Sequence, residues 1–169
     1  MRKAIGAYVR WVDRLNRWVG KAVMLLVFMM MAILLYSAWT KNFSIPPLWA
    51  IEMAQFTMAA YYLLGGAYSL QLNGHVRMDL AYSRWSPRTR AAMDAVTVLF
   101  LIFYLGVLLA GAIASTEYAL QYGETYYSSW APKMAPIKII MCIGIVLILL
   151  QAVSTFFRNV AEARGEPFP

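Results

Sequence analysis

The stretch AVMLLVFMMMAILLYSAWT, residues 22–40, contains no Asp, Glu, Lys or Arg and is almost wholly apolar. A helix of about 20 such residues crosses a hydrocarbon layer of ~30 Å. Three further stretches also lack charged residues, namely residues 53–74, 95–116 and 139–157. The sequence therefore predicts an all-α integral membrane protein with four transmembrane helices.

The composition excludes an ordinary soluble globule. Of the 169 residues, 62% are hydrophobic and 14% are charged, whereas soluble domains carry about 45 to 50% apolar and roughly 25% charged residues. The first charge-free stretch is too long for the core of a signal peptide, and no cleavage site followed by a soluble domain comes after it. We expect one membrane domain over residues 1–169, with spans near residues 20–40, 49–72, 92–117 and 137–157.

Basic residues set the expected orientation, because Lys and Arg beside the spans are retained in the cytoplasm. If the N-terminus is cytoplasmic, only three of the 15 basic residues lie outside, Lys41, Lys133 and Lys138. Both termini are therefore expected in the cytoplasm. The net charge of +7 is divided among three membrane flanks. It does not form the single basic stripe that nucleic-acid binding requires, so no nucleic-acid partner is expected.

The residues before the first span have an amphipathic pattern. Apolar side chains recur at helical spacing, and the basic residues share the opposite side; the apolar set is Ile5, Tyr8, Val9, Val12, Leu15 and Val19. This pattern predicts a helix over residues 4–18 that lies on the inner leaflet, with Trp11 and Trp18 at the depth of the headgroups. A membrane anchor is the favoured interpretation, and a docking element for a partner is the alternative.

The third span is expected to begin at Ser86-Pro87, where Ser caps a helix and Pro takes the first helical position. A short helix is also predicted in the cytoplasmic loop before it. Small residues follow one another at helical spacing in the second and third spans, at Gly65, Ser69, Gly106, Ala110, Gly111, Ala114 and Ser115. Such faces allow another helix to approach closely.

Little in the chain indicates catalysis. The one histidine, His75, lies in the cytoplasmic loop and not in a span, which excludes a haem held by two histidines inside the membrane. Cys142 is the only cysteine, and no nucleophile triad, cysteine cluster or phosphate-binding glycine loop is present. We expect no enzyme activity and no catalytic, cofactor-binding or metal-binding residues.

Three ionisable residues lie within one or two turns of the predicted outer interface, Glu52, Glu117 and Lys138. Charges near the middle of a membrane usually mark ion pathways, but charges near the interface are cheaper to solvate. An ion pair between helices or with a partner is favoured for them; plain solvation and a coupling-ion role are the alternatives. Gln55, Gln71 and Gln151 are interpreted as hydrogen-bonding groups between helices.

The loop after the second span carries the most specific sequence pattern. NGHVRMDLAY at residues 73–82, followed by WSPRTR at residues 85–90 and by Asp94, resembles the signature of a known family. That family is the small membrane subunit, or Q subunit, of tripartite ATP-independent periplasmic (TRAP) transporters. Glu52 after Trp49, and Pro136 to Lys138 before the last span, fit the same pattern.

The resemblance implies a bacterial inner-membrane system in which a soluble periplasmic protein captures an organic anion, such as a carboxylate. It passes the anion to a large membrane subunit, which moves it inward with sodium ions. The small subunit would be a non-catalytic scaffold in a stable complex with the large subunit, would contact the binding protein only transiently, and would be surrounded by lipid. The family loop would give structural or partner-contact roles to His75, Arg77, Asp79, Tyr82, Ser86, Pro87 and Arg88. The competing interpretations are a self-sufficient small transporter and a membrane anchor of another complex.

Overall fold

The computed structural model describes residues 2–43, 47–72 and 87–164. Their regular structure is helical: α1 covers Arg2–Phe43, α2 Ala50–Gln71, α4 Pro87–Tyr122 and α5 Ala135–Ala163. The all-α prediction is confirmed for this part of the chain. α4 begins at Pro87, the residue that the sequence places at the first helical position. The short helix predicted in the cytoplasmic loop falls outside the described residues.

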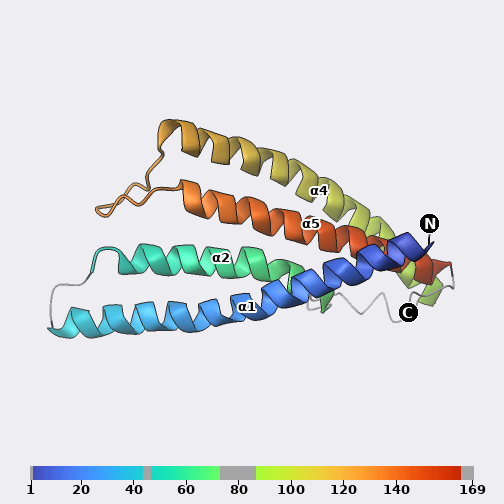
Figure 1. Cartoon of the computed structure of the whole chain (residues 1–169), viewed down its shortest axis with the longest axis horizontal. Helices are drawn as coiled ribbons and strands as arrows, with labels where there is room; N and C mark the ends of the chain where they lie inside the picture. The colour runs from blue at the N-terminus through green and yellow to red at the C-terminus, as the bar shows by residue number, and fades with distance from the viewer. Residues whose placement is uncertain (1, 44–46, 73–86, 165–169) are drawn as a thin grey trace.

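The helices lie side by side in the order α4, α5, α2, α1 (Figure 1). Neighbours in this order pack on each other, and the first part of α1 also contacts α5. We call the end of the bundle that carries residues 47–49 and 123–134 the loop end. The opposite end, with the start of α1 and the end of α5, is the terminal end. Helices α1 and α4 form the two edges of the molecule, so each leaves most of its surface uncovered.

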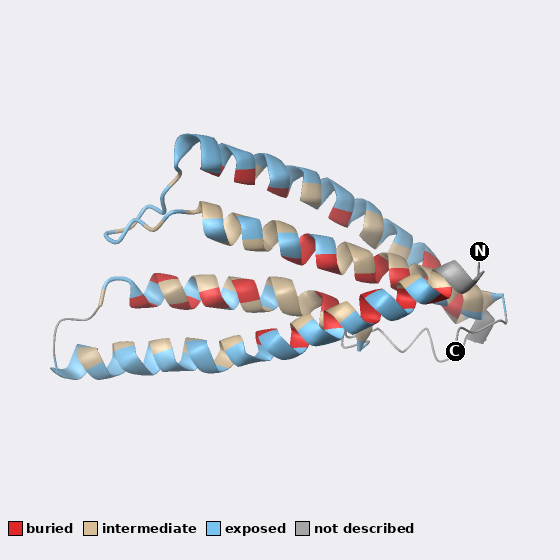
Figure 2. Ribbon diagram, viewed as in Figure 1, coloured by how far each residue is buried: buried red, intermediate tan, exposed pale blue. Residues whose placement is uncertain are grey.

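Three of the four described helices are long and apolar enough to cross a membrane, with candidate spans at Ile5–Phe43, Thr89–Tyr122 and Ala135–Ala163. In the most apolar 18-residue segment of each helix, 11% of the residues are buried in α1, 17% in α4 and 33% in α5. The outer faces of the edge helices are exposed, as the pale blue ribbon in Figure 2 shows, and many of the exposed side chains there are large and apolar. α2 is not among these candidate spans, and its 22 residues include Glu52, Gln55 and three tyrosines.

α1 is one helix of 42 residues, about 63 Å long at 1.5 Å per residue, which is longer than a hydrocarbon layer of ~30 Å. The predicted amphipathic segment 4–18 is therefore continuous with the first predicted span. Val9 and Val12 are buried on this segment, and two polar residues on the same face, Asp13 and Asn16, bond to α5. Trp11 and Trp18 lie on the exposed side.

α4 and α5 pack along a seam of small and branched side chains. Leu105 and Ala112 of α4 meet Ile145 and Ala152 of α5 in the core of the bundle. The buried positions of α4 are separated by 3, 4, 7 or 10 residues, all of which are sums of three- and four-residue steps, at Ala91, Ala95, Leu105, Ala112, Thr116 and Ala119. Side chains at this spacing interlock with those of a neighbouring helix, so the seam runs along most of α4.

Glycines set the distance between α2 and its neighbours. A Cβ atom added at Gly144 of α5 would lie 2.9 Å from the backbone of Leu63 in α2. A Cβ atom added at Gly20 of α1 would overlap the ring of Tyr68. Because these two sites have no side chain, the helices approach more closely than ordinary residues would allow.

Most of the small residues predicted to pack in the third span are not covered by other residues that the structure describes. Gly106, Ala110, Gly111 and Ala114 are exposed on α4, and a Cβ atom at either glycine would meet nothing within 4 Å. In α2, Gly65 faces Val23 of α1, whereas Ser69 is exposed. The small-residue face of α4 is thus open to the surroundings of the molecule.

Candidate functional site

A network of buried polar side chains joins α1 to α5 near the terminal end. Asn16, which is 1% exposed, donates from Nδ2 to Oε1 of Gln151 at 2.7 Å. Gln151, which is fully buried, donates from Nε2 to Oδ1 of Asp13 at 3.1 Å. Asp13 also forms an ion pair with Arg158. A polar group buried without a partner is costly, so each of these contacts favours the arrangement that supplies the partner.

Tyr8 extends this α1–α5 network by one turn of α1. Its hydroxyl donates to the carbonyl oxygen of Leu150 at 3.1 Å, and its ring meets Phe157 edge to face. Two buried oxygen atoms at the network, Oδ1 of Asn16 and Oγ of Ser154, have no hydrogen-bond partner among the residues that the structure describes. The network is therefore a strong attachment between the start of α1 and the second half of α5, with some hydrogen-bonding capacity unused.

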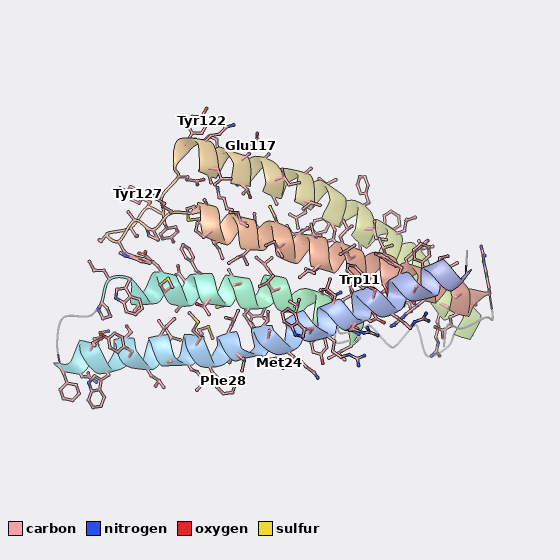
Figure 3. The ribbon with its side chains drawn as sticks, in the orientation of Figure 1. Trp11, Met24, Phe28, Glu117, Tyr122 and Tyr127 are labelled. Carbon is pink, nitrogen blue, oxygen red and sulfur yellow. The ribbon has the colours of Figure 1, made fainter. Side chains whose placement is uncertain are left out.

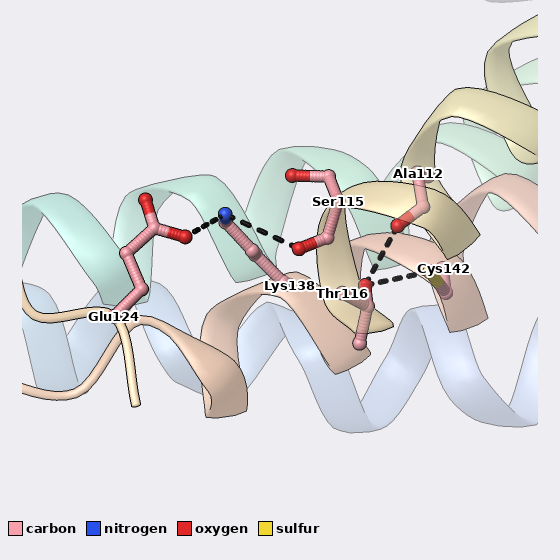
Figure 4. Close-up of polar contacts among 6 residues, drawn as sticks. All are labelled: Ala112, Ser115, Thr116, Glu124, Lys138 and Cys142. Carbon is pink, nitrogen blue, oxygen red and sulfur yellow. Dashed lines mark hydrogen bonds and ion pairs between the residues drawn. The ribbon is translucent and has the colours of Figure 1, made fainter. Parts of the chain in front are cut away.

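A second polar cluster lies at the loop end (Figure 4). Lys138 of α5 forms an ion pair with Glu124 and donates to the carbonyl oxygen of Ser115 at 3.4 Å. One turn deeper, the hydroxyl of Thr116 lies 3.3 Å from Sγ of Cys142. Lys138 thus ties the connecting loop to the ends of both α4 and α5.

That connecting loop has an ordered backbone. Gly123 ends α4 with a positive φ of 61°, as is common just after a helix. The amide of Tyr126 then donates to the carbonyl of Pro132 at 2.8 Å, and the amide of Met134 donates to the carbonyl of Glu124 at 2.9 Å. The loop is therefore a short hairpin with Tyr127 fully exposed.

The three ionisable residues singled out in the sequence are in different environments. Glu52 is buried in the first turn of α2, and its Oε2 atom has no hydrogen-bond partner. Glu117 lies on the exposed side of α4, pointing away from the bundle (Figure 3). Lys138 pairs with Glu124 and not with either of the other two. The structure therefore does not bring these three together into one site.

The remaining sequence candidates belong to the family loop. His75, Arg77, Asp79, Tyr82 and Ser86 fall outside the described residues, as do the side chains of Pro87 and Arg88. In the described ranges, no group of three His, Cys, Asp or Glu side chains could hold a metal ion. The polar contacts of Asp13, Asn16, Gln151 and Arg158 join α1 to α5, and the Lys138–Glu124 pair joins α5 to the connecting loop.

Sequence reasoning identified Gln151 as a group that bonds between helices, and its two hydrogen bonds to α1 agree with this interpretation. It missed Asp13, Asn16 and Glu124. A signal was present for the first two: Asp13 and Asn16 follow Val9 and Val12 at helical spacing. They therefore belong to the buried face and not to the basic one.

Comparison with known proteins gives one match. Residues 40–162 fit the model of the family described as tripartite ATP-independent periplasmic transporters, DctQ component. The match spans well over half of the chain, from the last turn of α1 to the end of α5. No curated protein and no solved structure matches the chain.

Proposed function

Because the chain belongs to the DctQ component family of tripartite ATP-independent periplasmic transporters, we propose that it is the non-catalytic scaffold of its transporter. In this proposal it packs stably against the large membrane subunit. That subunit carries out sodium-coupled uptake of organic anions, carboxylates among them, and a soluble periplasmic protein delivers the anions and binds only transiently. The family membership itself makes this chain the small membrane subunit.

The main support for the scaffold proposal is the exposed outer face of α4, at one edge of the bundle. α4 packs chiefly on α5 and leaves Gly106 and Gly111 without a neighbour. Transmembrane helices associate through small residues that let their backbones come close. A helix of the large subunit seated on this face would cover surface that the chain does not cover itself. Contact with the partner is also proposed for Glu52, whose buried Oε2 lacks a hydrogen bond, and for the family loop.

Reconstitution tests the proposed function directly. The purified chain in liposomes is expected to move no organic acid under a sodium gradient, and addition of the large subunit and the binding protein is expected to restore uptake. Radiolabelled carboxylates provide the measurement. Glu52→Gln should lower the yield of the two-subunit complex more than it changes the sodium dependence of the remaining uptake. Sodium-driven uptake by this chain alone would instead identify a self-sufficient transporter, and co-purification with an unrelated complex would identify an anchor.

We also propose that α2 spans the membrane together with α1, α4 and α5, and that the loop end faces the periplasm. The position of α2 between α1 and α5 supports the first point, and the bias of basic residues supports the second. In a Cys142→Ser background, a cysteine at exposed Ser129 should react with an impermeant maleimide in intact cells. A cysteine at exposed Arg164 should react only after the membrane is permeabilised. The reverse pattern would show that the orientation is wrong.

A further inference from the structure

A groove lies between α2 and α5 at the loop end, with α1 on its other side. Its volume is about 770 Å³, within the range of ~300 to 1,000 Å³ of protein sites for small apolar ligands. Met29 of α1, Met53 and Leu64 of α2, and Ile140 of α5 are among the side chains that form its walls. Three helices thus surround a concave and mainly apolar space.

The depth of the groove corresponds to one leaflet of a membrane. Its lining on α2 runs from Met53 to Leu64, which is about 16 Å along a helix. A hydrocarbon layer of ~30 Å consists of two leaflets of about half that depth each. An acyl chain that enters the groove at the loop end would therefore have room to lie along α2 over its natural length.

The mouth of the groove is lined by Trp130 and Lys133 of the loop hairpin. Tryptophan is typical of the membrane interface, where its ring meets both headgroups and hydrocarbon. The ammonium group of Lys133 makes no ion pair with any side chain in the described ranges, whereas Lys138 is already paired with Glu124. An exposed and uncompensated cation at this position complements a lipid phosphate.

The lining argues against a helix of another subunit as the occupant. Interfaces between transmembrane helices are rich in Gly, Ala, Ser and Thr. Here the walls carry mainly long or bulky side chains, and only Thr57, Ala60 and Ala131 of the lining residues are small. Flexible methionines such as Met29 adapt to the irregular shape of a hydrocarbon chain.

We propose that this groove binds one phospholipid from the leaflet at the loop end. An acyl chain lies along α2 between α1 and α5, and the phosphate group meets Lys133 beside Trp130. The inference requires only that the chain resides in a membrane. It does not depend on a role in transport, and its test uses this chain alone.

Native mass spectrometry of the purified, delipidated chain provides the test, with phosphatidylglycerol added at graded concentrations. The unmodified chain is expected to retain one phospholipid more tightly than all others. Met29→Trp fills the groove from an exposed position and should weaken this first binding step at least tenfold. Met31→Trp is the matched control, because Met31 is similarly exposed on α1 but does not line the groove. It should bind as the unmodified chain does.

Two further arms address the headgroup. Lys133→Gln should weaken binding of phosphatidylglycerol about fivefold, whereas Lys41→Gln, an exposed lysine at the end of α1, should have no effect. Diacylglycerol, which lacks the phosphate, should bind both lysine variants equally. Unchanged lipid binding by folded Met29→Trp would overturn the proposal. So would full competition by glycerol phosphate, which has no acyl chain.

Discussion

Replacing Gly144 with valine is expected to separate α5 from α2 and to destabilise the purified chain strongly. The new Cβ atom would lie 2.9 Å from the backbone carbon and oxygen of Leu63, and a backbone cannot move aside as a flexible side chain can. Overpacking of this kind costs about 1 to 3 kcal/mol in a packed core. Because α5 contacts α1, α2 and α4, the loss of stability should reach the whole bundle. A large fall in the midpoint of denaturation by SDS, followed by circular dichroism, would record it.

Gly106→Val is the matched control for this prediction. It places the same side chain on an apolar helix, but a Cβ atom at Gly106 meets nothing within 4 Å inside the chain. The stability of the isolated chain should therefore be unchanged. If the open face of α4 holds a partner helix, the same variant should lower the yield of the two-subunit complex. Equal destabilisation by both valines would contradict the packing of α2 against α5.

Asp13→Ala is expected to release the first part of α1 from α5. The change leaves the buried Nε2 atom of Gln151 without its acceptor, and an unsatisfied buried donor costs about 1 to 3 kcal/mol. The loss of the ion pair adds less, because the side chain of Arg158 is 43% exposed and water screens its charge. Hydrogen exchange should rise over residues 5–16 while α2 and α4 keep their protection.

Two variants separate this effect from a general loss of stability. Asp13→Asn keeps an oxygen that can accept from Gln151 but removes the charge, so its effect should be intermediate. Arg14→Ala removes an exposed neighbour on the other side of the helix, and its exchange pattern should match that of the unmodified chain. Unchanged exchange in Asp13→Ala would mean that the apolar contacts of Val9 and Val12 alone hold α1 on α5.

The sequence predicted the helical class, the start of α4 at Pro87 and the family, because charge-free stretches and the loop pattern are local signals. It did not predict that α1 continues without a break through Gly20. Glycine often follows the end of a helix. In the structure Gly20 lies within α1 and makes room for the ring of Tyr68. Two helices approach each other closely only in the packed bundle, so a short stretch of sequence cannot predict this approach.

The polar contacts were harder to predict for the same reason. Gln151 was recognised because an amide in an apolar span needs a partner, but nothing near it in the chain identifies Asn16, which lies 135 residues earlier. For Lys138 an ion pair between helices or with a partner was favoured, without a named carboxylate. Glu124 takes this role because the hairpin of residues 123–134 folds back over the start of α5.

The α1–α5 network also sets an order of events during synthesis. Arg158 is synthesised 145 residues after Asp13, its partner in the ion pair. At about 5 to 20 residues per second, their synthesis is separated by roughly 7 to 30 s. Throughout that interval the start of α1 has no protein surface to join, so its acid and amide side chains remain hydrated beside the membrane. The network therefore closes only after α5 has been made and inserted beside α1.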